Sequence, residues 1–241
     1  MTREKKVILA TAAVGFMSNG GMVISPALAS IIEHFSDVPV TLVQMLITVP
    51  ALMMIPASLV SSYLNRYFPS RKIFECCLIA LAIAGIIPFL VQDFIIIFIS
   101  RIIVGCSIGS MGPLANALIA NTFVGSNKDR AIGIYTASES IGGASMVFFS
   151  GIIVKLGWKY NFLIYLIAII ELIIVTLFCP KDDKVYSSTI ESRAMRTSRI
   201  INPTILYVWI VFFIYMAFLN TFPPNIALFI EGEGLGTSTI C

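Results

Sequence analysis

The sequence predicts an all-α membrane protein, and two observations lead to that class. Of the 241 residues, 58% are hydrophobic and only 12% are charged, and the mean hydropathy is +0.93. A soluble domain carries about 25% charged residues to cover its surface. The apolar residues also gather in runs that are long enough to cross a hydrocarbon core of about 30 Å as helices.

Seven apolar segments of roughly 19–26 residues divide the chain. Backbone groups in lipid need partners within their own segment, so each segment is expected to be a helix. The strands of a β-barrel would be half as long and would alternate in polarity. A secretory signal is the alternative for the first segment, but that run is long and no soluble domain follows it. The segments are residues 7–31, 41–64, 73–91, 94–119, 131–154, 161–179 and 203–222.

The basic residues predict the orientation of these helices. With the N-terminus inside and the helices alternating, all of the 16 Lys and Arg fall in inside loops except Lys155, Lys159 and Arg101. Cytoplasmic loops are enriched in Lys and Arg. We therefore expect a multi-pass protein of the plasma membrane with a cytoplasmic N-terminus.

Three parts follow from this arrangement: a six-helix bundle over 1–179, a cytoplasmic linker over 180–202, and a seventh helix with the start of a second bundle over 203–241. Within the six helices, "SPALASII" of the first segment is similar to "GPLANALI" of the fourth. The second and fifth segments each end just before a base, Arg66 and Lys155. Two three-helix units of opposite orientation are typical of inverted-repeat transporters.

Other function classes lack their residues. His34 has no second histidine or cysteine near it in the sequence, so no metal is expected. No phosphate-binding G-x-x-x-x-G-K-[ST] is present, which argues against an ATP-driven protein. We expect no enzyme, no cofactor and no nucleic-acid partner. The five cysteines are interpreted as small hydrophobic residues.

Three motifs, in order along the chain, resemble those of the major facilitator superfamily. "RIIVGCSIG" (Arg101–Gly109) matches the R-x-x-x-G-x-x-x-G of its fourth helix, and "GWKYNF" (Gly157–Phe162) matches the exit of its fifth. "SSYLNRYFPSRK" is similar to the loop G-x-L-x-D-R-x-G-R-K in Arg66, Arg71 and Lys72. It departs from that loop where Asn65 replaces the aspartate, where serine replaces the first glycine, and in being about two residues longer.

The resemblance implies a bundle of two inverted three-helix repeats plus a seventh helix, truncated relative to the twelve-helix fold. It also implies secondary active transport of a small molecule across the lipid bilayer, with the remaining C-terminal half or a second chain needed for a full transporter. A half-transporter or a non-transporting membrane scaffold is the alternative. Drug–proton antiporters of the family carry G-P-x-x-G-G in the fifth helix, and here Ser138 and Glu139 stand where its glycine and proline would be.

Glu139 is the first candidate site residue, because an ionised carboxylate deep in the membrane is costly. It must face a water-filled cavity, pair with a base, or hold a proton. It shares one helix stripe with Tyr135, Gly142 and Gly143, the least lipid-like face of that segment. We expect a proton or substrate site on a cavity wall, with a protonated structural glutamate as the alternative. Glu171, in the sixth segment, is expected to be the structural one of the two.

Arg101 raises the same question with the opposite charge. The resemblance implies a cavity-facing arginine that takes part in proton coupling, and an arginine that holds the first and fourth helices together is the alternative. Asn19, beside two glycines, and Asn116, on the face of Arg101, complete the expected proton and substrate pathway with Tyr135 and Glu139. A loosened, glycine-rich helix is the alternative for Asn19.

The loop Asn65, Arg66, Arg71 and Lys72 is expected to gate the cytoplasmic side by binding helix C-terminal carbonyls or Asp129, with simple positive-inside anchoring as the alternative. Methionine and aromatic residues on the expected cavity favour efflux of lipophilic or amphipathic compounds, coupled to protons, over uptake of sugars or metabolites. Those residues are Met17, Met22, Met111, Tyr135 and Met146.

Overall fold

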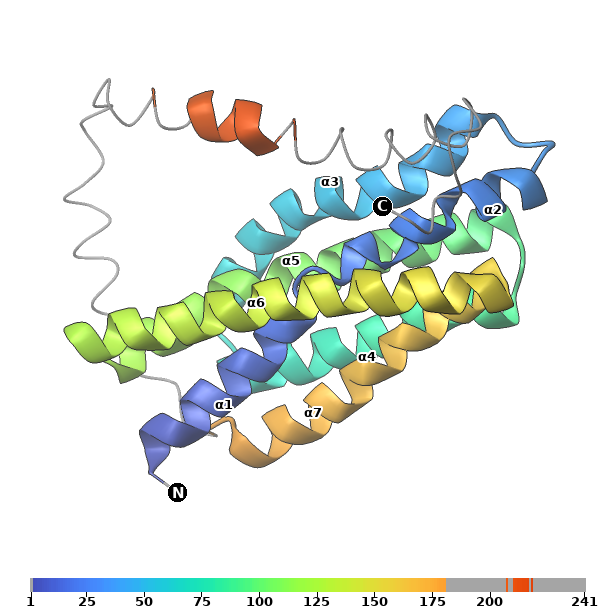
Figure 1. The fold of residues 1–241 in the computed structure, drawn as a ribbon. Coiled ribbons are helices and arrows are strands. Elements are labelled where there is room, and N and C mark those ends of the chain that lie inside the picture. The colour runs from blue at the N-terminus through green and yellow to red at the C-terminus, as the bar shows by residue number, and fades with distance from the viewer. Residues whose placement is uncertain (1, 181–206, 208–209, 217, 219–241) are drawn as a thin grey trace. The chain divides into compact units, whose positions relative to one another are not determined.

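The structure, a computed structural model, describes residues 2–180, 207, 210–216 and 218 (Figure 1). The chain divides into two compact units, Met1–Lys184 and Val185–Cys241. Apart from Pro180, the predicted linker over 180–202 lies outside the described residues. In the second unit the described residues Tyr207, 210–216 and Phe218 are helical, within the predicted seventh helix.

The first unit is a bundle of helices long and apolar enough to cross a membrane, and the six predicted segments all appear. Three spans are composite. The first joins α1 (Arg3–Phe16), the 3₁₀ helix η1 (Gly20–Ala27) and α2 (Leu28–His34), the fifth joins α6 (Ser126–Ile153) and the short 3₁₀ helix η2 (Val154–Leu156), and the sixth joins the 3₁₀ helix η3 (Trp158–Leu166) and α7 (Ile167–Phe178). The others are α3 (Val40–Leu64), α4 (Ser70–Leu90) and α5 (Phe94–Thr122).

Local sequence explains where these helices begin. Asp93 caps α5, because its carboxylate accepts the backbone N–H groups of Ile95 and Ile96. Pro39 and Pro69 precede α3 and α4, where a missing N–H costs nothing. Gly125 has a φ of 61° and lets the chain turn into α6. The helix therefore starts at Ser126, five residues before the apolar run, and carries polar turns beyond the predicted span.

Packing within the bundle follows a two-fold pattern. The second span packs on the fourth (α3 on α5), and the fifth packs on the first (α6 on α1 and η1). The third span packs on the fourth (α4 on α5), and the sixth packs on the first (α7 on α1). If each of the first three spans is swapped with the span three places later, the contacts of the second and third spans with the fourth become the contacts of the fifth and sixth spans with the first. Two inverted three-helix repeats require this correspondence.

Glycines set the closest of these contacts. A Cβ on Gly105 would lie 2.5 Å from the carbonyl oxygen of Pro50, and one on Gly109 would collide with the backbone of Met54. These two glycines of the Arg101–Gly109 motif therefore let α5 approach the backbone of α3. Small residues serve this purpose between membrane helices, because close backbone approach replaces the missing hydrophobic drive.

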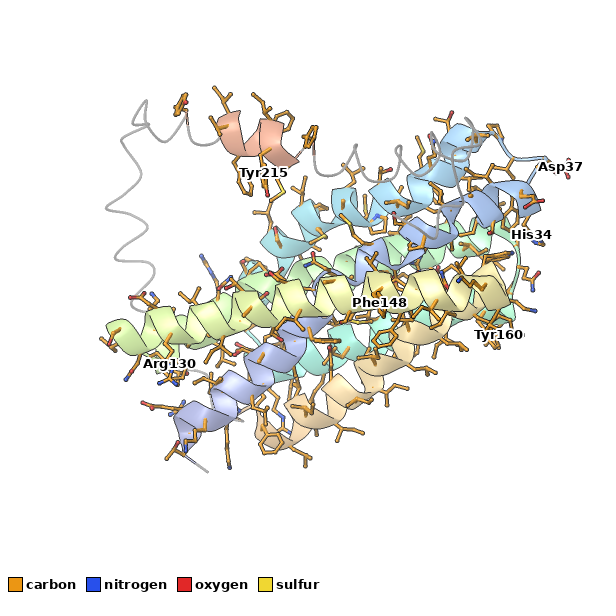
Figure 2. The ribbon with its side chains drawn as sticks, viewed as in Figure 1. His34, Asp37, Arg130, Phe148, Tyr160 and Tyr215 are labelled. Atoms are coloured by element: carbon orange, nitrogen blue, oxygen red, sulfur yellow. The ribbon has the colours of Figure 1, made fainter. Side chains whose placement is uncertain are left out.

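The two ends of the bundle differ in character. His34, Asp37 and Tyr160 lie at one end, and Arg130 lies at the opposite end (Figure 2). At the first end, the ring of His34 lies 5.1 Å from that of Trp158, and Phe35 contacts both. Successive loops therefore alternate between the two ends. The basic-residue pattern predicts that the Arg130 end is cytoplasmic.

Candidate functional site

A pocket of about 300 Å³ lies among α3, α5, α6 and the turn that follows α1 in the first unit. Its wall is mostly apolar, with a few hydroxyl groups and one carboxylate, that of Glu139. Ligand sites are concave and apolar with a small number of polar groups that fix orientation. The lining residues are Ser18, Met54, Ile55, Ser58, Ile108, Gly109, Gly112, Pro113, Tyr135 and Glu139.

Glu139 is the charged group of this pocket. It is the fourteenth of the 28 residues of α6, about 20 Å from the start of the helix. The sequence places it ninth, and the difference arises because α6 begins at Ser126. The side chain is partly exposed, and in the described part of the chain neither an ion pair nor a hydrogen bond holds its carboxylate. The carboxylate therefore opens onto the pocket, without a base beside it.

The stripe predicted on α6 is its packing face. Tyr135, Gly142, Gly143, Met146 and Ser150 are all buried. A Cβ on Gly142 would collide with the backbone of Phe16, the last residue of α1. This part of the prediction is confirmed: the small residues face the first span, and Glu139 lies at the edge of that face.

Hydroxyl and amide groups connect the first span to α6 near Glu139. The hydroxyls of Ser18 and Tyr135 lie 3.4 Å apart, and both residues line the pocket. Asn19 Nδ2 donates to the backbone carbonyl of Glu139 at 3.2 Å. The helix is also loosened here, since α1 ends at Phe16 and a 3₁₀ helix follows from Gly20. Asn19 was interpreted either as a polar residue of the pathway or as the mark of a loosened helix. The structure has a feature that corresponds to each: a contact between helices and a break in the first span.

Arg101 and Asn116 are not brought to the pocket wall. Arg101 is fully buried, and its Nη1 donates to the hydroxyl of Tyr165 at 2.8 Å. Its guanidinium lies 5.0 Å from the ring centres of Phe162 and Tyr165. Asn116, four turns along α5, is exposed. The shared face of α5 is thus buried at Arg101 and open at Asn116.

The segment Asn65–Lys72, which joins α3 to the start of α4, makes the expected contact with a carbonyl at the C-terminal end of a helix. Arg71 Nη1 donates to the carbonyl of Cys179, the C-cap of α7, at 3.4 Å, and its Nε pairs with Glu75 at 2.8 Å. Asn65 Oδ1 accepts the Ser70 hydroxyl at 2.8 Å, so it ties the loop to the start of α4. Lys72 and Asp129 are exposed.

Sequence reasoning missed most of the apolar pocket wall. Of the five residues expected to line a cavity, Tyr135 does so, while Met17, Met111 and Met146 are buried inside the bundle. The wall is formed instead by Met54, Ile55 and Ile108. These apolar residues could not be predicted, because an apolar side chain in an apolar helix does not show which way it faces. For Ser18 the sequence did carry a signal, because it is the neighbour of Asn19.

No cofactor or metal cradle accompanies the pocket in the described residues. Among them, no three His, Cys, Asp or Glu side chains are arranged to hold a metal ion. The site offers one carboxylate, the paired hydroxyls of Ser18 and Tyr135, the hydroxyl of Ser58 bonded to the Ile55 carbonyl, and an apolar wall. Such a site suits binding and proton exchange.

The fold and the pocket define a multi-pass membrane protein built from inverted three-helix repeats. The family model of the Major Facilitator Superfamily matches residues 7–241. The chain belongs to this superfamily. A comparison with curated proteins returns no match.

Two solved structures share the fold. Both are of a bacterial homolog of the human lysosomal transporter Spinster, in inward-facing conformations. The occupied one has a TM-score of 0.58 and 22% identity, over 76% of this chain and 45% of that chain. The unoccupied one has a TM-score of 0.61 and 19% identity, over 77% of this chain and 45% of that chain. At these identities the likeness concerns the fold, and the chain spans less than half the length of either structure.

Proposed function

We propose that this chain forms the N-terminal six-helix bundle of a secondary transporter that moves small molecules across the membrane by alternating access. Family membership and the inverted-repeat packing support the class. The proposed partners are the lipid bilayer, a small-molecule substrate, protons, and a C-terminal half or second chain. The proposed location is the plasma membrane, with the N-terminus in the cytoplasm, on the basis of the Lys and Arg distribution.

The observation that carries the more specific proposal is the single carboxylate of Glu139 on an otherwise apolar pocket wall. A carboxylate at this depth is stable when it holds a proton or faces water or a cation. We propose that Glu139 exchanges a proton with the pocket as the transporter changes state. Tyr135 and Asn19 shape the wall beside it, and Asn116 extends the pathway along α5.

The composition of the wall favours lipophilic or amphipathic substrates. Met54, Ile55 and Ile108 offer apolar surface, whereas the hydroxyls of Ser18 and Tyr135 are close enough to satisfy each other. A sugar would need hydrogen-bond partners for each of its hydroxyls, because an unpaired buried polar group is costly. We therefore propose proton-coupled efflux rather than sugar uptake.

The loop Asn65–Lys72 is proposed to help close the cytoplasmic side. Arg71 connects the start of α4 to the end of α7, and such a contact between helix ends can form in one state and break in another. Asn65 supports it through Ser70. Arg66 and Lys72 add positive charge at the same place.

The test is Glu139→Gln in the full-length protein, reconstituted in liposomes and assayed with ethidium as the probe under an imposed pH gradient. Glutamine preserves size and hydrogen bonding, so folding and ethidium binding should persist. The response of transport to the pH gradient should be lost. Glu171→Gln is the matched control and should change it less. An unchanged pH response in Glu139→Gln would show that proton coupling lies elsewhere.

A further inference from the structure

The first span contains an unusually long 3₁₀ segment. η1 runs for eight residues, from Gly20 to Ala27, and includes Pro26. Runs of 3₁₀ helix beyond three or four residues are uncommon, because their hydrogen-bond geometry is poorer than that of an α-helix. A segment of this length therefore needs support from its neighbours. η1 packs against η3, the 3₁₀ segment of the sixth span.

Two chains of hydrogen bonds provide this support, and each ends on a backbone carbonyl of η1. In the first, Arg101 Nη1 donates to the Tyr165 hydroxyl at 2.8 Å, and that hydroxyl donates to the carbonyl of Gly20 at 2.6 Å. In the second, Asn161 Nδ2 donates to the Ser150 hydroxyl at 2.9 Å, and that hydroxyl donates to the carbonyl of Val23 at 2.5 Å. The two carbonyls are one 3₁₀ turn apart.

Burial makes these bonds costly to lose. Arg101, Tyr165, Asn161 and Ser150 all have an exposed fraction of 0% or close to it. A buried donor or acceptor that loses its partner bears the full cost of its desolvation. Among the described residues, Arg101 Nη1 is bonded while Nε and Nη2 have no partner, so the Tyr165 hydroxyl is the main polar contact of this buried cation.

The ring of Tyr165 is itself held in place. A Cβ on Gly85 of α4 would collide with the Cβ and ring of Tyr165, so the glycine makes the space that the ring occupies. The ring also faces the guanidinium of Arg101, with 5.0 Å to the ring centre. Such a cation–π contact is favourable within about 6 Å. The hydroxyl is therefore aimed at Gly20 by packing from two helices.

The segment held in this way is also the one that reaches the pocket. Asn19, next to Gly20, donates to the carbonyl of Glu139, and Ser18 lies beside the hydroxyl of Tyr135. A Cβ on Gly143 would lie 3.0 Å from the Asn19 side chain, so the amide fits closely against α6. A shift of Gly20 would therefore move Asn19, which contacts the part of α6 that carries Glu139.

We propose that Arg101, Tyr165, Asn161 and Ser150 are positioning residues that hold η1 in its 3₁₀ form and so fix Asn19 against the carbonyl of Glu139. Arg101 then acts on the pocket through Tyr165 and Gly20, without lining it. The proposal rests on the proposed function only in taking this pocket to be the transport site.

The test is amide hydrogen exchange, read by mass spectrometry, on the full-length protein in nanodiscs. Tyr165→Phe and Ser150→Ala each remove one hydroxyl that reaches η1, and exchange over residues 19–27 should become about tenfold faster in each. Tyr160→Phe and Ser145→Ala are the matched controls. Tyr160 lies in the same 3₁₀ helix without reaching η1, and Ser145 bonds within α6 to the carbonyl of Gly142. Equal exchange in test and control variants would overturn the proposal.

A double-mutant cycle tests the link to the pocket. Tyr165→Phe should also speed exchange over residues 139–146, and this effect should largely vanish when Asn19 is already alanine. A role confined to stability would instead speed exchange throughout the bundle and would not depend on Asn19, and that result would overturn the positioning role. Hydrogen exchange needs no substrate. It therefore tests the positioning role even if the protein proves not to transport the proposed substrates.

Discussion

Gly142 is the position at which the packing of α6 against the first span can be tested most directly. A Cβ at this position would lie 2.6 Å from the carbonyl carbon of Phe16 and 2.7 Å from its Cα. Carbon atoms in ordinary contact are about 3.5–4.0 Å apart, so in Gly142→Ala the two helices must separate by about 1 Å. The obstacle is backbone, which has no rotamer with which to avoid the methyl group.

The magnitude follows from two opposing effects. Overpacking of this kind costs about 1–3 kcal/mol, whereas glycine to alanine in a helix gains up to about 1 kcal/mol in propensity. We expect a net loss of about 1–2 kcal/mol, which lowers the melting temperature by about 3–6 °C if each kcal/mol corresponds to about 3 °C. The shift should also weaken the contact of Asn19 with Glu139, because both lie within a turn of the collision.

Gly133→Ala is the matched control, because it lies in the same helix and its Cβ would meet nothing within 4 Å. It should keep or raise the melting temperature of the detergent-solubilised protein, measured by the loss of the monodisperse peak on size-exclusion chromatography after heating. Equal melting temperatures for the two variants would refute the close approach of α6 to Phe16.

The remaining predictions concern topology, the buried carboxylate and the cytoplasmic loop. Cysteines introduced at Ser36 and Ser187 should react with a membrane-impermeant maleimide from opposite sides of the membrane, Ser36 from outside and Ser187 from the cytoplasm. Reaction of both from the same side would contradict the orientation. Glu171 is 3% exposed, and neither carboxylate oxygen has a partner in the described residues, so Glu171→Leu should raise the melting temperature; a fall would mean that the carboxylate is bound. Arg71→Gln should barely change the melting temperature, because partly exposed ion pairs contribute about 0.2–1 kcal/mol, but it should slow ethidium transport. An unchanged transport rate would count against gating.

Much of the site was visible in the sequence. Glu139 and Tyr135 were predicted from depth and helical spacing, and both line the pocket. Asn19 was predicted to be polar within the membrane, and it contacts the backbone of Glu139. These positions could be predicted because a polar group in an apolar segment must find a partner or water, and that requirement is independent of the neighbouring helices. The role of these residues in a proton or substrate pathway stays a prediction.

By itself the sequence determined the class of protein, the number of the first six spans and their approximate limits, since hydropathy and the thickness of the membrane dictate these. The depth of Glu139 depended on where α6 begins, and only the structure placed that start at Ser126. Only the tertiary structure decided which way each group faces. Helix α5 is apolar on all sides, so nothing in its pattern distinguishes a cavity-facing Arg101 from one buried against Tyr165. The partners of Tyr165 lie 64 and 145 residues away, at Arg101 and Gly20, and only the packing of three spans brings them together.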